Sequence, residues 1–153
     1  MNSHAKEVKS ALLKKAQEIL QNQVKDIENQ LKQLIQAGAE EGKSSAGDKY
    51  ETQGEMIKQS RDLLDIQFSR TKSMLKQLKH IPTQDQSSVQ EGALLKLSIG
   101  WILVSVSLGK LEMDGQEYQL ISKDSPLFLA LKNKKVGEKV SFRGKDLMVE
   151  GVV

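Results

Sequence analysis

Between residues 5 and 37 the chain has neither proline nor glycine, and its apolar residues recur at alternating steps of four and three. The clearest members of this stripe are Leu20, Val24, Ile27, Leu31 and Leu34. Leu13 and Ala16 extend the stripe toward the N-terminus less regularly. Charged residues and glutamines fill the other positions, as in the heptad pattern of a coiled-coil seam. The pattern predicts one amphipathic helix that is about 45 Å long.

A second helical pattern covers residues 51–79. Its apolar residues are Ile57, Leu64, Phe68, Leu75 and Leu78, with Arg61 and Thr71 at the weaker steps. Neither helix can bury its stripe alone, and isolated amphipathic helices are marginal in water. The two patterns therefore predict an antiparallel coiled-coil hairpin over residues 1–80.

The segment between the two helical patterns, residues 38–50, is rich in glycine and small residues. We expect it to form a loop at the tip of the hairpin. Asp48 is the expected N-cap of the second helix, and Glu51 follows three residues later, as in a capping box.

The hydrophobic period changes after residue 80. Residues 81–92 are polar and contain Pro82, which predicts a linker. Apolar runs at 93–98 and 101–108 predict strands, and a turn at Asp114-Gly115 predicts a β-hairpin. A short helix is expected after Ser125 or Asp124, with Pro126 at its first position, and a further hairpin is expected to turn at 143–146. The chain is therefore expected to be α+β, with a small β-rich domain at 93–153.

The amino-acid composition excludes several kinds of site and segment. The chain has no cysteine, which excludes disulfides and thiolate metal sites, and its two histidines, His4 and His80, are too few for a histidine cluster. No apolar run reaches the roughly 18 residues of a membrane span, and the first ten residues lack the apolar core of a signal peptide. We expect a cytoplasmic protein that carries no metal or cofactor and has no contact with membranes.

One C-terminal segment carries a family resemblance. Its elements are Ser125-Pro126, Ala130-Leu131, Lys134-Lys135 and Val136-Gly137-Glu138, in that order. This segment resembles the C-terminal signature of the bacterial Gre transcript-cleavage factors, and a tip before Tyr50 occupies the place of the Gre tip. The matching residues lie near the C-terminus, whereas the similarity of architecture covers almost the whole chain.

The resemblance implies that RNA polymerase is the partner and that the two parts of the chain have different roles. In the Gre family the coiled coil enters the secondary channel of RNA polymerase, and acidic tip residues help to hold a catalytic magnesium, so that a backtracked transcript is cut. The C-terminal domain is FKBP-like and docks at the channel rim. The docking candidates here are Ser125, Pro126, Leu127, Ala130 and Leu131.

The tip departs from the family. Gre tips carry Asp and Glu in a stretch similar to DLSENAEY, whereas this chain reads KSSAGDKY, with Lys43 and Ala46 at those two places. Neither side chain can ligate magnesium. The remaining acids that we expect near the polymerase active site are Glu40, Glu41 and Asp48. We therefore expect binding to core RNA polymerase with weak or no stimulation of transcript cleavage.

Basic residues offer further contacts. The candidates for the nascent transcript or an acidic polymerase surface are Arg70, Lys72, Lys76, Lys134 and Lys135. Such runs more often form solvated faces. Trp101, Tyr118 and Phe142 are expected in the core. Together with Phe128 they are too few to predict a prolyl isomerase pocket.

Two other classes of function remain open. One alternative is a structural protein, unrelated to transcription, whose seam pairs with another coiled coil or with its own copy. A monomer is the favoured state. An enzyme acting on its own is the least favoured reading, because no acid, base and nucleophile stand in a recognisable constellation.

Overall fold

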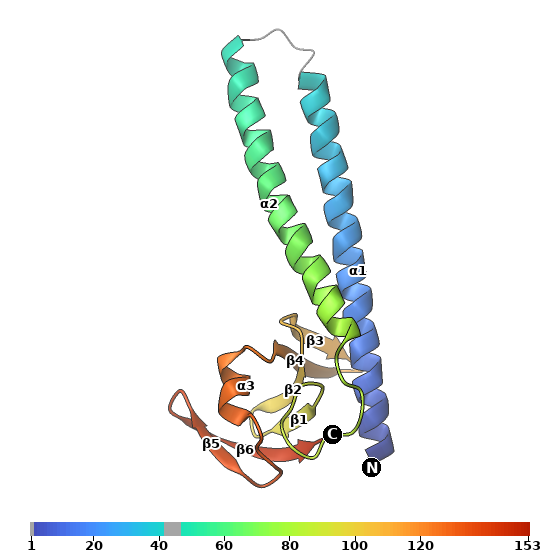
Figure 1. Ribbon diagram of the computed structural model, residues 1–153, viewed down its shortest axis with the longest axis vertical. Helices are drawn as coiled ribbons and strands as arrows, with labels where there is room; N and C mark the ends of the chain where they lie inside the picture. The colour runs from blue at the N-terminus through green and yellow to red at the C-terminus, as the bar shows by residue number, and fades with distance from the viewer. Residues whose placement is uncertain (1, 42–46) are drawn as a thin grey trace. The chain divides into compact units, whose positions relative to one another are not determined.

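The computed structural model describes residues 2–41 and 47–153 (Figure 1). The chain divides into two compact units. One unit, which we call the sheet unit, joins Met1–Gln17 to Lys76–Val153, and the other, the helical unit, is Glu18–Leu75. The helices α1 (Asn2–Glu41) and α2 (Gly47–Lys79) each contribute residues to both units. The chain is α+β, as the sequence predicts.

The helical unit consists of the parts of α1 and α2 that run in opposite directions (Figure 1). Leu20, Val24 and Ile27 of the predicted stripe are buried, as is Leu64 of α2. Farther along α1 the burial decreases: Leu31 and Leu34 are half-buried, and Ile35 is 55% exposed. The apolar seam is therefore closest between Leu20 and Ile27, and it becomes shallower toward the end of α1.

The two weak steps of the second stripe differ in the structure. Thr71 is buried, and its hydroxyl donates a hydrogen bond to the Gln67 carbonyl oxygen over 2.8 Å. Its polar group is therefore satisfied within its own helix, and the residue fits a buried position. Arg61 remains exposed.

The segment between the helices is shorter than the loop predicted at 38–50, because α1 extends to Glu41 and α2 begins at Gly47. Gly38 lies inside α1, where nothing approaches the position of a Cβ within 4 Å. One interior glycine costs about 1 kcal/mol of helix stability, which the helix-forming residues around it offset. Asp48 lies within α2 and not before it, so the predicted N-cap is wrong.

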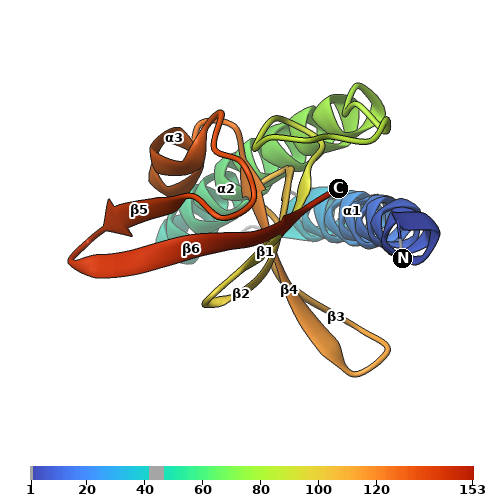
Figure 2. The ribbon, with the colours of Figure 1, turned by 90° about the horizontal axis from the view of Figure 1, so that it is seen from below.

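The sheet unit contains a mixed sheet whose strands stand in the order β3-β4-β2-β1-β6-β5. The strands are β1 (Leu94–Leu97), β2 (Gly100–Ser105), β3 (Gly109–Met113), β4 (Gln116–Ser122), β5 (Lys139–Phe142) and β6 (Lys145–Val152). β2 and β4 are parallel, and the other neighbours are antiparallel. β3 and β5 are the edges, and they lie at opposite ends of the sheet in Figure 2.

Two tight turns join the outer pairs of strands. Asp114 and Gly115 have φ angles of 52° and 77°, and Arg143 and Gly144 have 51° and 80°. Two consecutive positive φ angles are typical of the type I′ turn that suits a two-residue hairpin. The first turn is confirmed as predicted, whereas the second is shorter than predicted because residues 145 and 146 belong to β6.

Both faces of the sheet are covered within this unit. On one face, the helix α3 (Pro126–Leu131) and the segment before β1 close a buried cluster. That cluster consists of Val89, Ala93, Leu95, Leu97, Ile102, Val104, Ile121, Phe128, Leu131 and Val149. The strand residues between these alternate to the other face, where Leu94, Leu103 and Leu120 are buried.

The first turns of α1 also belong to the core of the sheet unit. Leu12 and Ala16 are fully buried, whereas Leu13, which the sequence pattern favoured, is half-buried. Leu12, Ala16 and Leu20 follow one another at steps of four, so the buried face continues without a break. The prediction of Leu13 is therefore corrected to Leu12.

Residues 81–92, predicted as a linker, are packed into the sheet unit. Val89 is fully buried; its N–H donates to the Lys134 carbonyl oxygen at 2.8 Å, and its own carbonyl accepts from the Asn133 N–H at 2.9 Å. Gly92 has a φ of +90°, and a Cβ there would lie 2.3 Å from the Pro82 carbonyl oxygen. The segment therefore requires glycine at this position, and its residues Ile81, Val89 and Gly92 are buried.

Candidate docking cleft

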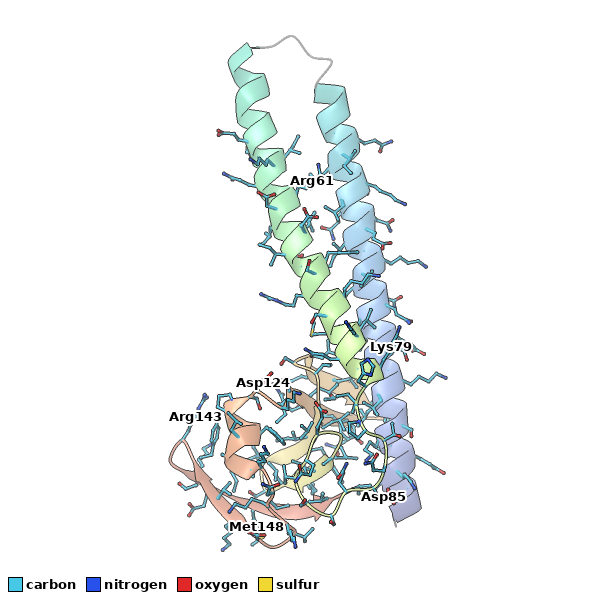
Figure 3. The ribbon with its side chains drawn as sticks, viewed as in Figure 1. Arg61, Lys79, Asp85, Asp124, Arg143 and Met148 are labelled. Carbon is cyan, nitrogen blue, oxygen red and sulfur yellow. The ribbon has the colours of Figure 1, made fainter. Side chains whose placement is uncertain are left out.

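The sheet unit has a surface cleft of about 560 Å³, where β2 and β4 begin and where the start of α3 and the β5–β6 turn approach them. Arg143, in that turn, lies at the tip of the hairpin in Figure 3. The residues that line the cleft include Ile99, Trp101, Tyr118, Ser125, Pro126, Leu127, Phe142 and Arg143.

The start of α3 is fixed by its own sequence. Ser125 has an extended backbone, and its hydroxyl oxygen accepts a hydrogen bond from the Phe128 N–H at 3.1 Å. Pro126 follows at the first helical position, where its missing N–H costs nothing. The predicted cap is confirmed, and it holds Ser125, Pro126 and Leu127 at the wall of the cleft.

Aromatic side chains form much of the cleft. Trp101 and Tyr118 are neighbours across the parallel strands β2 and β4, with ring centroids 6.2 Å apart and ring planes inclined by 48°. The Arg143 guanidinium lies 5.0 Å from the centre of the Phe142 ring. The three aromatic residues expected in the core thus line the cleft, whereas Phe128 of α3 is buried in the cluster between α3 and the sheet.

The charged groups of the cleft stand at its rim. Lys110 and Glu117, which line the cleft, form an ion pair of 3.7 Å. The Lys96 ammonium, which does not line the cleft, lies 5.6 Å from the centre of the Trp101 ring. Burial raises the pKa of Tyr118, and the negative charge of Asp114 raises it further. The phenol therefore stays neutral at physiological pH and can donate a hydrogen bond. The arrangement suits apolar and aromatic recognition with a few polar contacts.

The five predicted docking residues differ in their exposure and position in the structure. Ser125, Pro126 and Leu127 line the cleft, and Ala130 is half-buried. Leu131 is fully buried in the cluster beneath α3, so its side chain belongs to the core and offers no docking surface.

Two exposed apolar residues near α3 were missed by the sequence analysis. Leu129 is 62% exposed and Val136 is 58% exposed. A helix of six residues is too short for its periodicity to show which leucine points outward. The exposed apolar side chains make this part of the sheet unit a candidate contact surface.

The predicted tip residues lie outside what the structure describes. This holds for the side chains of Glu40, Glu41 and Asp48, and for Lys43 and Ala46 as a whole. Within the described part of the chain, no three His, Asp or Glu side chains are grouped in a way that could hold a metal ion.

The predicted basic contacts belong to different units. Arg70 and Lys72 are exposed in the helical unit, and the Lys72 ammonium lies 5.5 Å from the Phe68 ring centre. Lys76, Lys134 and Lys135 belong to the sheet unit. Lys134 forms an ion pair of 3.9 Å with Glu138, whose carboxylate also accepts the Lys135 N–H at 3.1 Å.

A buried lysine was also missed. Lys9 is fully buried, and its ammonium donates to the carbonyl oxygens of Gln84 at 2.9 Å and Val153 at 3.2 Å. Burial lowers its pKa, while Asp85 acts in the opposite direction and Lys6 lowers it slightly more. Lysine is rarely buried, so no pattern in the sequence indicated this position.

Comparison with known proteins yields a distant structural likeness. No family model matches the chain, and no curated protein matches it. The solved structure of the transcription factor Gfh1 matches with a TM-score of 0.39 and 16% identity, over 90% of this chain and 92% of that chain. None of the helices in the described residues has both the length and the apolar composition needed to span a bilayer.

Proposed function

We propose that this chain is a Gre-like transcription factor that binds core RNA polymerase through the secondary channel and modulates elongation. The observation that carries the proposal is the segment Ser125–Phe142. It folds as the resemblance leads one to expect, with a capped short helix, a lysine-rich turn, and Val136-Gly137-Glu138 before a strand. Two long helices precede it along the chain, as in that family.

In this proposal the two parts have different tasks. The helices α1 and α2 act as a coiled-coil hairpin that enters the channel, with Arg70, Lys72 and Lys76 available to the nascent transcript. The β-rich part acts as an FKBP-like base whose cleft and neighbouring Leu129 dock on the polymerase. The chain itself is not an enzyme, and its place of action is the cytoplasm, where the polymerase works.

The proposed effect on cleavage is weak or absent. The sequence has Lys43 and Ala46 where the Gre tip has its two acids. A lysine repels a divalent cation, and an alanine has no oxygen with which to ligate one. The three nearby acids Glu40, Glu41 and Asp48 are then the only tip carboxylates, and we propose that they contact the active site without restoring full cleavage.

A binding measurement tests the docking part. Leu129→Asp places a charge on an exposed apolar side chain, so the fold should tolerate it, while affinity for immobilised core polymerase should fall by about tenfold. Ser87→Asp adds the same charge at another exposed position of the sheet unit and serves as the control. Failure of the unaltered chain to bind at micromolar concentration and low salt would end the proposal.

A cleavage assay on stalled elongation complexes tests the tip. The unaltered chain should stimulate little or no cleavage, and the triple change of Glu40, Glu41 and Asp48 to alanine should change this little. Strong stimulation that disappears in the triple variant would show that these acids form a working catalytic tip.

A second candidate is a structural protein that pairs through a helical seam. It is favoured by a stripe on α2 in which Met56, Leu63 and Ile66 are all exposed, at steps of seven and three. Sedimentation equilibrium distinguishes the candidates in part. A polymerase-binding factor should stay monomeric across concentration, whereas a dimer that dissociates on dilution would favour the second candidate.

A further inference from the structure

The two edges of the sheet are protected differently. Met113 and Gln116 flank the two-residue turn after β3, so Lys110 and Glu112 direct their backbone groups away from β4. The Lys15 ammonium donates a hydrogen bond to the outward Glu112 carbonyl oxygen. A side chain of α1 thus occupies the β3 edge and prevents another strand from pairing there.

At the β5 edge α3 packs close to the strand, but among the described residues no side chain makes a hydrogen bond like that of Lys15. Phe142 and Lys145 flank the turn, and Val140 pairs with Leu147, so Lys139 and Ser141 direct their backbone groups away from β6. The hydrogen bond of 3.0 Å from the Val149 N–H to the carbonyl of residue 138 agrees with this register. Among the described residues, none donates to or accepts from these four outward backbone groups.

The side chains of β5 alternate between two environments. Lys139 and Ser141 are exposed, whereas Val140 and Phe142 are half-buried. Val140 packs against the cluster beneath α3, and Phe142 lines the cleft. A strand added beside β5 would therefore have one face in water next to Lys139 and the other face next to apolar side chains.

The surroundings of β5 are basic. Residues 132–146 contain six basic residues and two acids, and Glu138 is already engaged by Lys134 and by the Lys135 backbone. The basic residues are Lys132, Lys134, Lys135, Lys139, Arg143 and Lys145. All but Lys134 are exposed, so the edge carries an excess of positive charge.

A short edge strand with lysine also prevents two copies of the same sheet from joining. That protection depends on sign: a second copy brings the same positive charge and is repelled, whereas an acidic strand is attracted. The open backbone, the alternation of side chains and the charge thus select for the same partner. β5 contains a single aromatic residue, Phe142, which is half-buried and lines the cleft. The strand therefore has no row of exposed aromatic rings on which bases could stack, so nucleic acid is a poorer fit.

We propose that the β5 edge binds an extended acidic segment of a partner protein, which adds to the sheet as a further strand. Acidic residues of that segment alternate with apolar ones, so that the acids face Lys139 and the apolar side chains face Val140 and Phe142. This binding does not depend on RNA polymerase and goes beyond the proposed function.

Fluorescence anisotropy with defined peptides tests the proposal on the full chain. The probe is a labelled eight-residue peptide of alternating glutamate and valine, and the control replaces glutamate by lysine. The acidic peptide should bind at least tenfold more tightly. N-methylation of the amides on one edge of the acidic peptide keeps its charge but removes its strand-pairing hydrogen bonds, and it should abolish binding.

Two variants of the protein distinguish the contribution of backbone hydrogen bonds to peptide binding from that of charge. Ser141→Pro removes an outward N–H without removing a hydrogen bond to β6, and edge strands accept proline at such a position. The variant should bind the acidic peptide about fivefold to tenfold more weakly. Lys139→Glu should weaken it about threefold. Lys79→Glu, at the exposed end of α2 (Figure 3), is the charge-matched control and should leave affinity unchanged.

Each other result overturns the proposal. Equal binding of the acidic and basic peptides removes the charge selection, and undiminished binding of the N-methylated peptide removes strand addition. If Ser141→Pro fails to fold, the methylated peptide and Lys139→Glu still decide the matter. Tighter binding of a labelled single-stranded RNA than of the acidic peptide would assign the basic edge to nucleic acid instead.

Discussion

The sheet unit and the helical unit are stabilised by different interactions. In the sheet unit both faces of the sheet carry fully buried aliphatic side chains, and the segment 81–92 is held by long-range hydrogen bonds. In the helical unit the seam is narrow, and Ile35, Met56, Leu63 and Ile66 remain exposed. The sheet unit should therefore have the higher local stability, as suits a recognition surface, and the helical unit should open more easily.

The largest expected effect is in the sheet unit. Gly92→Ala adds a Cβ that meets the Pro82 carbonyl oxygen at 2.3 Å, at a φ of +90° that alanine adopts poorly. Strain and crowding together should lower the free energy of unfolding by about 4 kcal/mol. Urea unfolding followed by the fluorescence of Trp101, the only tryptophan, reports on this unit. A loss below about 1 kcal/mol would show that the 81–92 segment is not fixed as described.

A pair of leucine truncations compares the two units directly. Leu103→Ala removes a fully buried side chain of β2 and should cost about 3 kcal/mol of unfolding free energy. Leu31→Ala removes a half-buried side chain of the seam and should cost about 1 kcal/mol. Tryptophan fluorescence and far-ultraviolet circular dichroism should be recorded together for both variants. Equal costs would mean that the seam is as well packed as the sheet.

How much of this fold the sequence predicts depends on the range of the interaction. The Asp114-Gly115 turn and the Ser125-Pro126 helix start are signals within a few residues, and both are confirmed. The burial of Val89 depends on residues 133 and 134, far along the chain, so a polar linker was the natural prediction. The extent of α1 past Gly38 was missed because one glycine is a weak stop signal.

The candidate site was predicted only in part for the same reason. Ser125, Pro126 and Leu127 were named from the local signature, and they line the cleft. The other walls, including Trp101 and Phe142, come from strands that are distant in sequence and approach one another only through the sheet order. Local periodicity carries no information about such pairings.

A smaller effect, confined to alkaline pH, concerns Lys9. In the unfolded chain its pKa is the ordinary 10.5, and burial lowers it in the folded state. Between the two values the unfolded state binds more protons, so the free energy of unfolding rises as pH rises toward 10.5. Lys9→Met lacks this contribution, so the stability of the unaltered chain relative to the variant should increase over that interval.

Comparing the unaltered chain with Lys9→Met removes the effect of Tyr118 on stability at alkaline pH. The raised pKa of Tyr118 lowers stability as pH rises above 10.0, but Tyr118 is present in both proteins and cancels in the difference. Thermal unfolding of the two proteins in parallel from pH 8 upward gives the comparison. A difference that stays constant or decreases would show that Lys9 is as well solvated as a surface lysine.

The smallest expected effect lies in the helical unit and has the opposite sign to that of Gly92. Gly54 is in α2, and nothing lies within 4 Å of the place where its Cβ would be. Gly54→Ala should therefore raise the helical unit's stability by about 0.5 to 1 kcal/mol. Amide hydrogen exchange in α2 is the suitable measurement, and faster exchange in the variant would contradict the open environment of Gly54.

The most direct test of the proposed function is competition for the polymerase. Core RNA polymerase carrying a labelled Gre factor in its secondary channel is titrated with the full chain, and the released label is measured. We expect the chain to displace the Gre factor completely, with Leu129→Asp requiring about tenfold more protein. Binding of both proteins to one polymerase at the same time, or no release at saturating chain, would contradict the proposal.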